Sequence, residues 1–174
     1  WLSSQRWPWH GLLAGLGGSG ILLLKPPALI GYLAMIGILT LLDRPSSRRP
    51  AALGWAMSGL IPGALWHLWH LWQRGSDALV MWGGQGFGRV TEVVGNNSGA
   101  WVMPLTEVLE GGWPWILLLP SGVAWAWRHR KTSMGLWELG LLIGSGLMVL
   151  PLRTQLPWYS HLLWPPIALL CGES

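Results

Sequence analysis

Charged residues are scarce in this sequence, which argues against an ordinary soluble domain. Only 10% of the 174 residues are Asp, Glu, Lys or Arg, whereas 51% are hydrophobic. Soluble domains carry about 25% charged residues. The composition therefore predicts a polytopic helical membrane protein, whose apolar helices face lipid instead of water.

Cysteine and phenylalanine are nearly missing as well. The single Cys171 excludes an internal disulfide and a metal site built from several cysteines. One Phe stands against 16 Trp, and Trp favours the membrane interface, where its ring and its N–H are both accommodated. Most cations lie in two short clusters beside apolar runs. This pattern indicates a membrane topology signal, and we expect no nucleic-acid partner.

Six apolar segments predict an all-α bundle of about six transmembrane spans. Prolines, glycines and cation clusters separate the segments. They cover residues 7–24, 28–42, 51–72, 113–127, 136–152 and 162–171. Gly11 and Gly15, and again Gly140 and Gly144, stand four residues apart, a spacing that lets helices approach closely. Because the last segment is too short to finish a span and the chain begins with Trp1, we expect residues 1–174 to be a single transmembrane domain from a longer protein.

The cation clusters also predict the orientation of the spans. Two crossings separate the basic clusters at 44–49 and 128–131, so both can lie in the cytoplasm, where Lys and Arg accumulate. Lys25, the polar segment 73–112 and the step 153–159 then share the opposite face. The sequence thus predicts one longer non-cytoplasmic loop.

Four cations are predicted on that opposite face: Lys25, Arg74, Arg89 and Arg153. In one interpretation each reaches out to lipid phosphates. In the other, several converge on one phosphate, for which Arg offers a bidentate fork and Lys a point charge. Lys25 suits the second interpretation because the prolines after it leave irregular backbone, which at membrane depth lines a cavity.

Other patterns predict less. His67 and His70 share a helix face, but a metal site needs a further ligand, so no metal-binding residue is assigned and a divalent metal stays open as a cofactor. The glycine-rich residues 83–88 lack the preceding strand and the Gly-Lys-Ser/Thr ending of a nucleotide loop. No pair of catalytic carboxylates is evident.

Five short motifs resemble those of one enzyme family. They are Lys25-Pro26-Pro27, Leu65-Trp66-His67, Gln85-Gly86-Phe87-Gly88-Arg89, Trp113-Pro114-Trp115 and Arg153-Thr154-Gln155-Leu156-Pro157-Trp158-Tyr159. In order and spacing they resemble the later part of GT-C-type membrane glycosyltransferases that use polyprenyl-phosphate sugars. That family includes the aminoarabinose transferases of lipid A and bacterial relatives of protein O-mannosyltransferases. In this chain Gln155 replaces a family cation, Gly86 stands where some members have His, and His161-Leu162 replaces a Leu-Pro.

The resemblance implies a hexosyl or pentosyl transferase of the bacterial inner membrane. Such an enzyme moves a sugar from a polyprenyl phosphate, among membrane lipids, to a glycan, lipid or protein acceptor on the non-cytoplasmic side. By resemblance, Lys25, Arg89, Arg153 and Tyr159 hold the donor phosphate. The acidic base of the family lies in a first loop that has no match here, so this chain alone is expected to be inactive.

Two other classes of protein remain open. A non-catalytic multispan membrane protein, such as a transporter fragment or a scaffold, would show the same glycine pairs, tryptophans and cation clusters. A polysaccharide polymerase or ligase would also use lipid-linked sugars across many spans.

Overall fold

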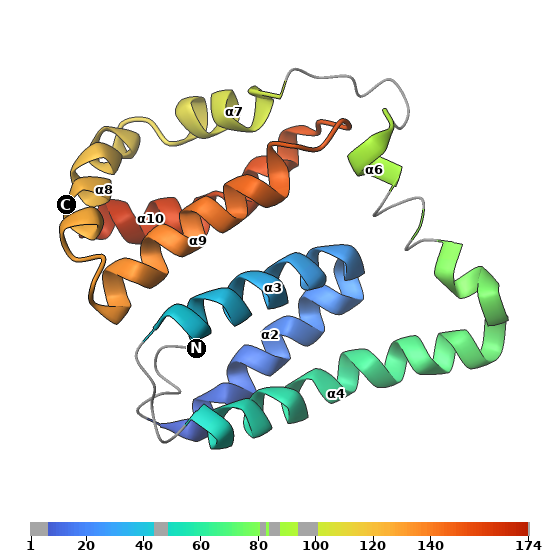
Figure 1. Cartoon of the computed structure of the whole chain (residues 1–174). Coiled ribbons are helices and arrows are strands. Elements are labelled where there is room, and N and C mark those ends of the chain that lie inside the picture. Colours follow the sequence, from blue (N-terminus) through green and yellow to red (C-terminus); the bar gives the residue numbers. More distant parts are fainter. Residues whose placement is uncertain (1–6, 44–48, 81–82, 84–87, 94–100, 174) are drawn as a thin grey trace. The chain divides into compact units, whose positions relative to one another are not determined.

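The protein is all-α, as the sequence predicts. The computed structural model describes residues 7–43, 49–80, 83, 88–93 and 101–173, and 85% of it is helical. The α-helices in Figure 1 are α2 (Gly11–Leu24), α3 (Pro26–Leu42), α4 (Arg49–Arg74), α6 (Gly88–Thr91), α7 (Met103–Gly111), α8 (Leu119–Arg128), α9 (Ser133–Val149) and α10 (Trp164–Gly172). Short 3-10 helices are η1 (Pro8–His10), η2 (Gly75–Leu79), η4 (Trp115–Leu118) and η5 (Pro157–Leu162).

The helices form two compact units. Unit 1 comprises residues 1–33 and 44–87, and unit 2 comprises residues 34–43 and 88–174. The helix α3 contributes its first half to unit 1 and its second half to unit 2. The prediction that residues 1–174 form one domain stays a prediction.

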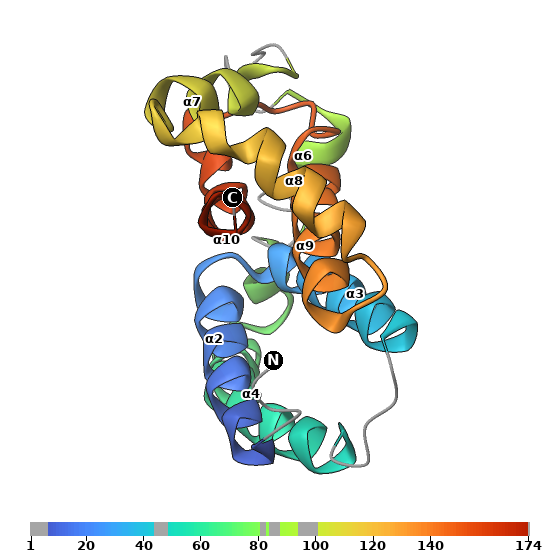
Figure 2. The same cartoon turned by 90° about the vertical axis from the view of Figure 1, so that its left-hand side faces the viewer.

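Unit 1 is built on the close packing of α2 against α4, which run side by side in Figures 1 and 2. The buried residues of α2 are Gly11, Gly15 and Ser19, which recur every fourth position and so share one face. A Cβ atom on Gly15 would collide with the carbonyl oxygen of Ala56 and lie 2.8 Å from the Cα atom of Gly59. The predicted close approach at Gly11 and Gly15 is therefore confirmed.

Ser19 joins the two helices by hydrogen bonds beside a proline. Its hydroxyl donates to the Gly59 carbonyl at 2.8 Å and accepts from the Gly63 N–H at 3.1 Å. Pro62, inside α4, has no N–H to contribute to the helix ladder. The Ser19 hydroxyl thus supports α4 at the turn that contains the proline.

Unit 2 packs the end of α3, α8 and α10 around α9. Cβ atoms on Gly140 and Gly144 of α9 would collide with the side chains of Leu39 and Met35, so this glycine pair also marks a close helix contact. On α8, a Cβ on Gly122 would collide with the carbonyl oxygen of Leu170 in α10. Small residues therefore set the helix spacing in both units.

A buried carboxylate fastens α3 to α9. Asp43, 9% exposed, follows the last residue of α3. It accepts hydrogen bonds from the Ser133 hydroxyl at 2.6 Å and from the Trp137 indole N–H at 3.0 Å. Thr132 caps the same helix start by accepting from the Gly135 N–H at 3.3 Å. The first turn of α9 is thereby fixed from two sides.

The prediction of about six transmembrane spans is wrong, and the reason is helix length. Among the described residues, no helix has both the length and the apolar character of a transmembrane span. The helices α3 and α9 have 17 residues each, or about 25 Å, whereas a hydrocarbon core is about 30 Å thick. The helices α2, α8 and α10 are shorter still, at 14, 10 and 9 residues.

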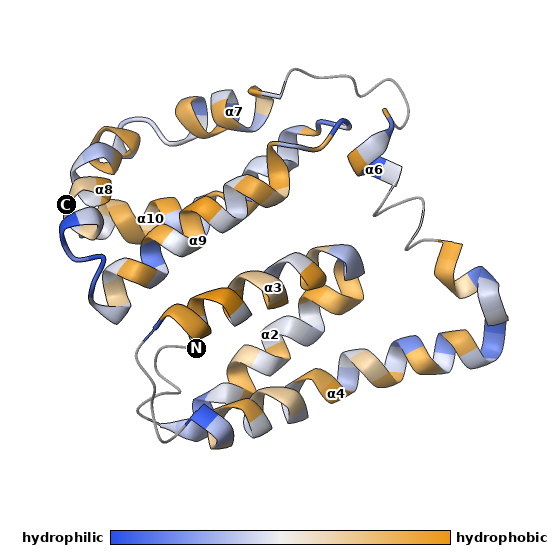
Figure 3. Ribbon diagram, viewed as in Figure 1, coloured by the Kyte–Doolittle hydropathy of each residue, from blue (hydrophilic) through white to orange (hydrophobic). Residues whose placement is uncertain are grey.

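Among the described helices only α4 is longer, with 26 residues, but it is only moderately apolar. It carries Arg49 and Arg74 at its ends and His67 and His70 in its second half. Figure 3 shows the hydrophilic colour at its C-terminal end and at the turn between α8 and α9. Three predictions are therefore wrong: the polytopic bundle, its longer non-cytoplasmic loop, and the localisation as an integral protein of the bacterial inner membrane.

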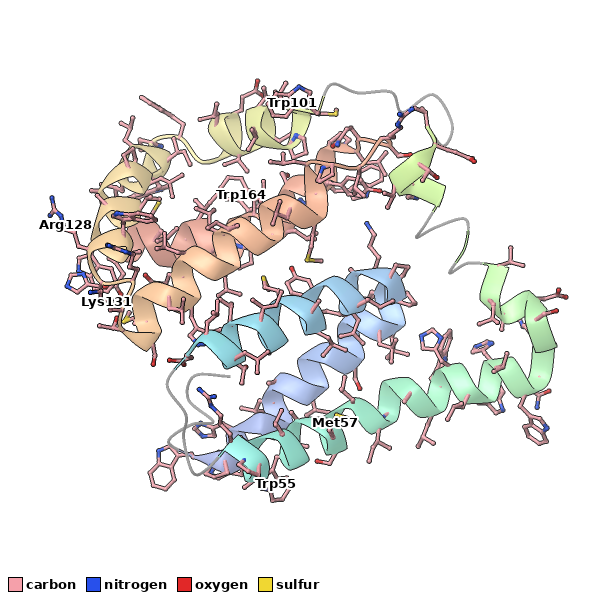
Figure 4. The ribbon with its side chains drawn as sticks, in the orientation of Figure 1. Trp55, Met57, Trp101, Arg128, Lys131 and Trp164 are labelled. Carbon is pink, nitrogen blue, oxygen red and sulfur yellow. The ribbon has the colours of Figure 1, made fainter. Side chains whose placement is uncertain are left out.

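Much of the apolar content lies on the surface of the described residues. Trp55, Met57 and Trp101, labelled in Figure 4, are 47%, 63% and 63% exposed. The hydrophobic fraction of the sequence thus reflects exposed side chains as well as buried ones.

Candidate anion-binding site

Three of the four predicted phosphate-binding residues belong to unit 2. Arg89 lies in the single turn of α6, and Arg153 and Tyr159 lie in the segment that connects α9 to α10. In Figure 1 this connection lies near α6, beyond the end of α9. Lys25 belongs to unit 1, so its grouping with the other three stays a prediction.

Thr154 ties the two segments of the site together. Its backbone N–H donates to the Arg89 carbonyl at 3.2 Å, and its hydroxyl donates to the Glu92 carbonyl at 2.8 Å. The Thr154 side chain is fully buried. Because buried hydrogen bonds of this kind are retained in the folded state, the α6 turn is held against the residue that follows Arg153.

Tyr159 positions the Arg89 guanidinium. The Arg89 Nη1 group donates to the Tyr159 phenol oxygen at 3.4 Å, a long bond between residues 70 positions apart. Tyr159 is 2% exposed and packs in an apolar cluster with Val149 and Leu156. A rigid, buried phenol therefore anchors a half-buried guanidinium from the opposite segment.

Arg153 carries a second guanidinium on the residue before Thr154. Its side chain is exposed, and its backbone neighbours the Thr154 link to Arg89. A guanidinium carries five N–H donors and remains charged at all ordinary pH values. Two such groups on adjoining segments suit an anion with several acceptor oxygens, such as a phosphate.

Lys25 sits at the break between α2 and α3. Its backbone is not helical (φ −151°, ψ 75°), and its N–H donates to the Ile21 carbonyl at 2.7 Å. Pro26 and Pro27 open α3 immediately afterwards, where proline is tolerated because no helical N–H is required. The sequence therefore places this break correctly.

The histidines of α4 make contacts of other kinds. His67 Nε2 lies 2.9 Å from the Leu22 carbonyl of α2, and the His70 ring lies 3.9 Å from the Trp66 ring. Within the described ranges, no group of three or more His, Cys, Asp or Glu side chains could hold a metal ion. A divalent metal as cofactor stays an open prediction.

Sequence reasoning missed Thr154 and Gln155 as parts of the site. Gln155 is 2% exposed, and its Nε2 group donates to the carbonyl of Val149, the last residue of α9, and to those of Leu150 and Leu152 just after it. The only signal in the sequence is that both are polar residues within a short step between two apolar segments. A comparison with known proteins finds no matching family, no matching curated protein and no matching solved structure.

Proposed function

We propose that Arg89, Arg153 and Tyr159 bind the phosphate of a polyprenyl-phosphate sugar. The chain is then part of a glycosyltransferase that passes the sugar to a glycan, lipid or protein acceptor. The observation that carries the proposal is the Arg89–Tyr159 hydrogen bond, which orients the Arg89 guanidinium. The Thr154 N–H holds the turn that contains Arg89 against the residue that follows Arg153. Guanidinium pairs are well suited to phosphate oxygens.

Exposed apolar side chains next to the cations favour a phosphate that carries a hydrocarbon chain. Val90, inside the α6 turn, and Val93, just after it, are 46% and 45% exposed, and Trp158, beside Tyr159, is 56% exposed. Apolar surface of this kind gains free energy when a hydrocarbon covers it. A polyprenyl phosphate supplies both the anion and the hydrocarbon.

The cations would act on the leaving group of the transfer. The bond between the sugar C1 and the phosphate oxygen breaks, and its electron pair stays on that oxygen. Positioned guanidiniums stabilise the charge that develops there. The acceptor hydroxyl forms the new bond to C1, and its proton passes to a general base. The resemblance assigns that base to an acidic residue outside these 174 residues, so the chain alone should bind a donor without transferring its sugar.

Binding of farnesyl phosphate to the purified 174-residue chain tests the proposal. Farnesol, which lacks the phosphate, isolates the contribution of the anion. A hydrogen bond to a charged group contributes about 1.5–3 kcal/mol. Arg89→Ala and Arg153→Ala should therefore each weaken farnesyl phosphate binding by about tenfold or more in calorimetry, and should leave farnesol binding unchanged. Tyr159→Phe should have a smaller effect in the same direction, because Arg89 keeps its charge and loses its positioning partner.

Arg74→Ala is the matched control, because it removes one exposed arginine from the end of α4 in unit 1. It should bind farnesyl phosphate like the unmodified chain. Unchanged affinity in both Arg89→Ala and Arg153→Ala, with helicity retained, would refute the phosphate site. Lys25→Ala, measured alongside, decides whether Lys25 contributes to it.

A further inference from the structure

Gln155 holds a buried acceptor atom that the described structure does not satisfy. Its Nε2 group lies 2.7 Å from the Leu152 carbonyl and 3.4 Å from the carbonyls of Val149 and Leu150. Its Oε1 atom is buried and has no hydrogen-bond partner among the described residues. An unsatisfied buried polar atom in a folded protein calls for a specific explanation.

The orientation of the Gln155 amide follows from its surroundings. Three backbone carbonyls face one end of the amide, and carbonyls only accept hydrogen bonds. The NH2 group must therefore occupy that end, and the oxygen must be the atom that faces away. What Gln155 lacks is a donor.

We propose that Gln155 Oε1 accepts a hydrogen bond from a hydroxyl group of the sugar attached to the bound phosphate. This inference rests on the proposed function and adds a residue that recognises the sugar. Gln155 stands two residues after Arg153 and four before Tyr159, so the acceptor lies in the same short segment as the phosphate-binding groups. The hydroxyls of a glycosyl phosphate lie only a few bonds from its phosphorus atom.

A sugar hydroxyl can supply the donor that Oε1 lacks, because its O–H donates a hydrogen bond to an amide oxygen. A site built to bond a hydroxyl also rejects an analogue that lacks one, because the acceptor is then left unpaired.

Gln155→Lys separates the two roles of this side chain. A lysine ammonium donates three hydrogen bonds and accepts none. It can still bond the carbonyls of Val149, Leu150 and Leu152, and it removes the acceptor. Gln73→Lys is the matched control, because it makes the same substitution at an exposed position of α4 in unit 1.

The test compares glucose 1-phosphate with methyl phosphate on the full chain, by phosphorus NMR titration. Both are phosphate monoesters, and only the first carries sugar hydroxyls. One hydrogen bond to a buried acceptor should give the unmodified chain a preference for glucose 1-phosphate of roughly fivefold to tenfold. Gln155→Lys should abolish the preference, and Gln73→Lys should retain it.

Three results would overturn the inference. Equal affinity of the unmodified chain for the two probes would mean that a buried water, and not a sugar, satisfies Oε1, and the phosphate site would stand; this measurement does not depend on the folding of a variant. A preference that survives in Gln155→Lys would assign sugar recognition to other residues. If neither phosphate binds, the proposed function itself fails.

Discussion

The buried carboxylate of Asp43 allows a quantitative test of how unit 2 is held together. Its two oxygens accept from the Ser133 hydroxyl at 2.6 Å and from the Trp137 indole N–H at 3.0 Å. Hydrogen bonds to a charged partner contribute about 1.5–3 kcal/mol each. Asp43→Ala should therefore lower the free energy of unfolding by about 3–6 kcal/mol, since it removes both.

Two milder variants should give graded effects. Trp137→Phe removes one donor and should cost about 1.5–3 kcal/mol, with a further loss from the smaller ring. Asp43→Asn should cost less than Asp43→Ala. The indole N–H can only donate, but the Ser133 hydroxyl can turn and accept, so an Asn could keep both bonds without the charge.

Urea unfolding followed by circular dichroism measures these changes, and a double-mutant cycle isolates the Asp43–Trp137 bond. We expect a coupling energy of about 1.5–3 kcal/mol, the value of one such bond. Trp101→Phe, at an exposed position of unit 2, is the matched control for the loss of an indole. If Trp137→Phe costs as much in the Asp43→Ala background as in the unmodified chain, the bond contributes nothing and the reasoning is wrong.

Two further predictions concern buried polar groups. Burial, and secondarily the charge of Glu173, raises the pKa of Glu138 above its ordinary value of 4.5. The folded state therefore binds this proton more tightly than the unfolded state, and stability falls as the pH rises from 4.5 through the raised pKa. Glu138→Gln should raise the urea midpoint at neutral pH and flatten its pH dependence; parallel pH profiles would contradict this. Ser19→Ala should lower the free energy of unfolding by about 1–3 kcal/mol, because the Gly63 N–H and the Gly59 carbonyl lose a buried partner. The exposed control Ser121→Ala should change little, and equal losses in the two variants would contradict the role of Ser19.

The sequence predicted the helix contacts better than the helix lengths. The glycine pairs marked close helix approaches in both units, because a missing Cβ is visible in the sequence and has one steric meaning. The predicted spans failed because hydropathy does not register where a helix starts. The apolar segment 113–127, for example, divides into the 3-10 helix η4 and the ten-residue helix α8.

The sequence by itself determined the all-α class, the break at Lys25-Pro26-Pro27 and the candidate cations. These follow from local properties: composition, the missing N–H of proline and the fixed charge of arginine. Only the tertiary structure decided that Arg89 meets Tyr159 across 70 positions, that Thr154 ties their segments together, and that the Gln155 amide leaves its buried oxygen without a donor. Those relations depend on which atoms become buried and face one another, and residue type alone does not specify them.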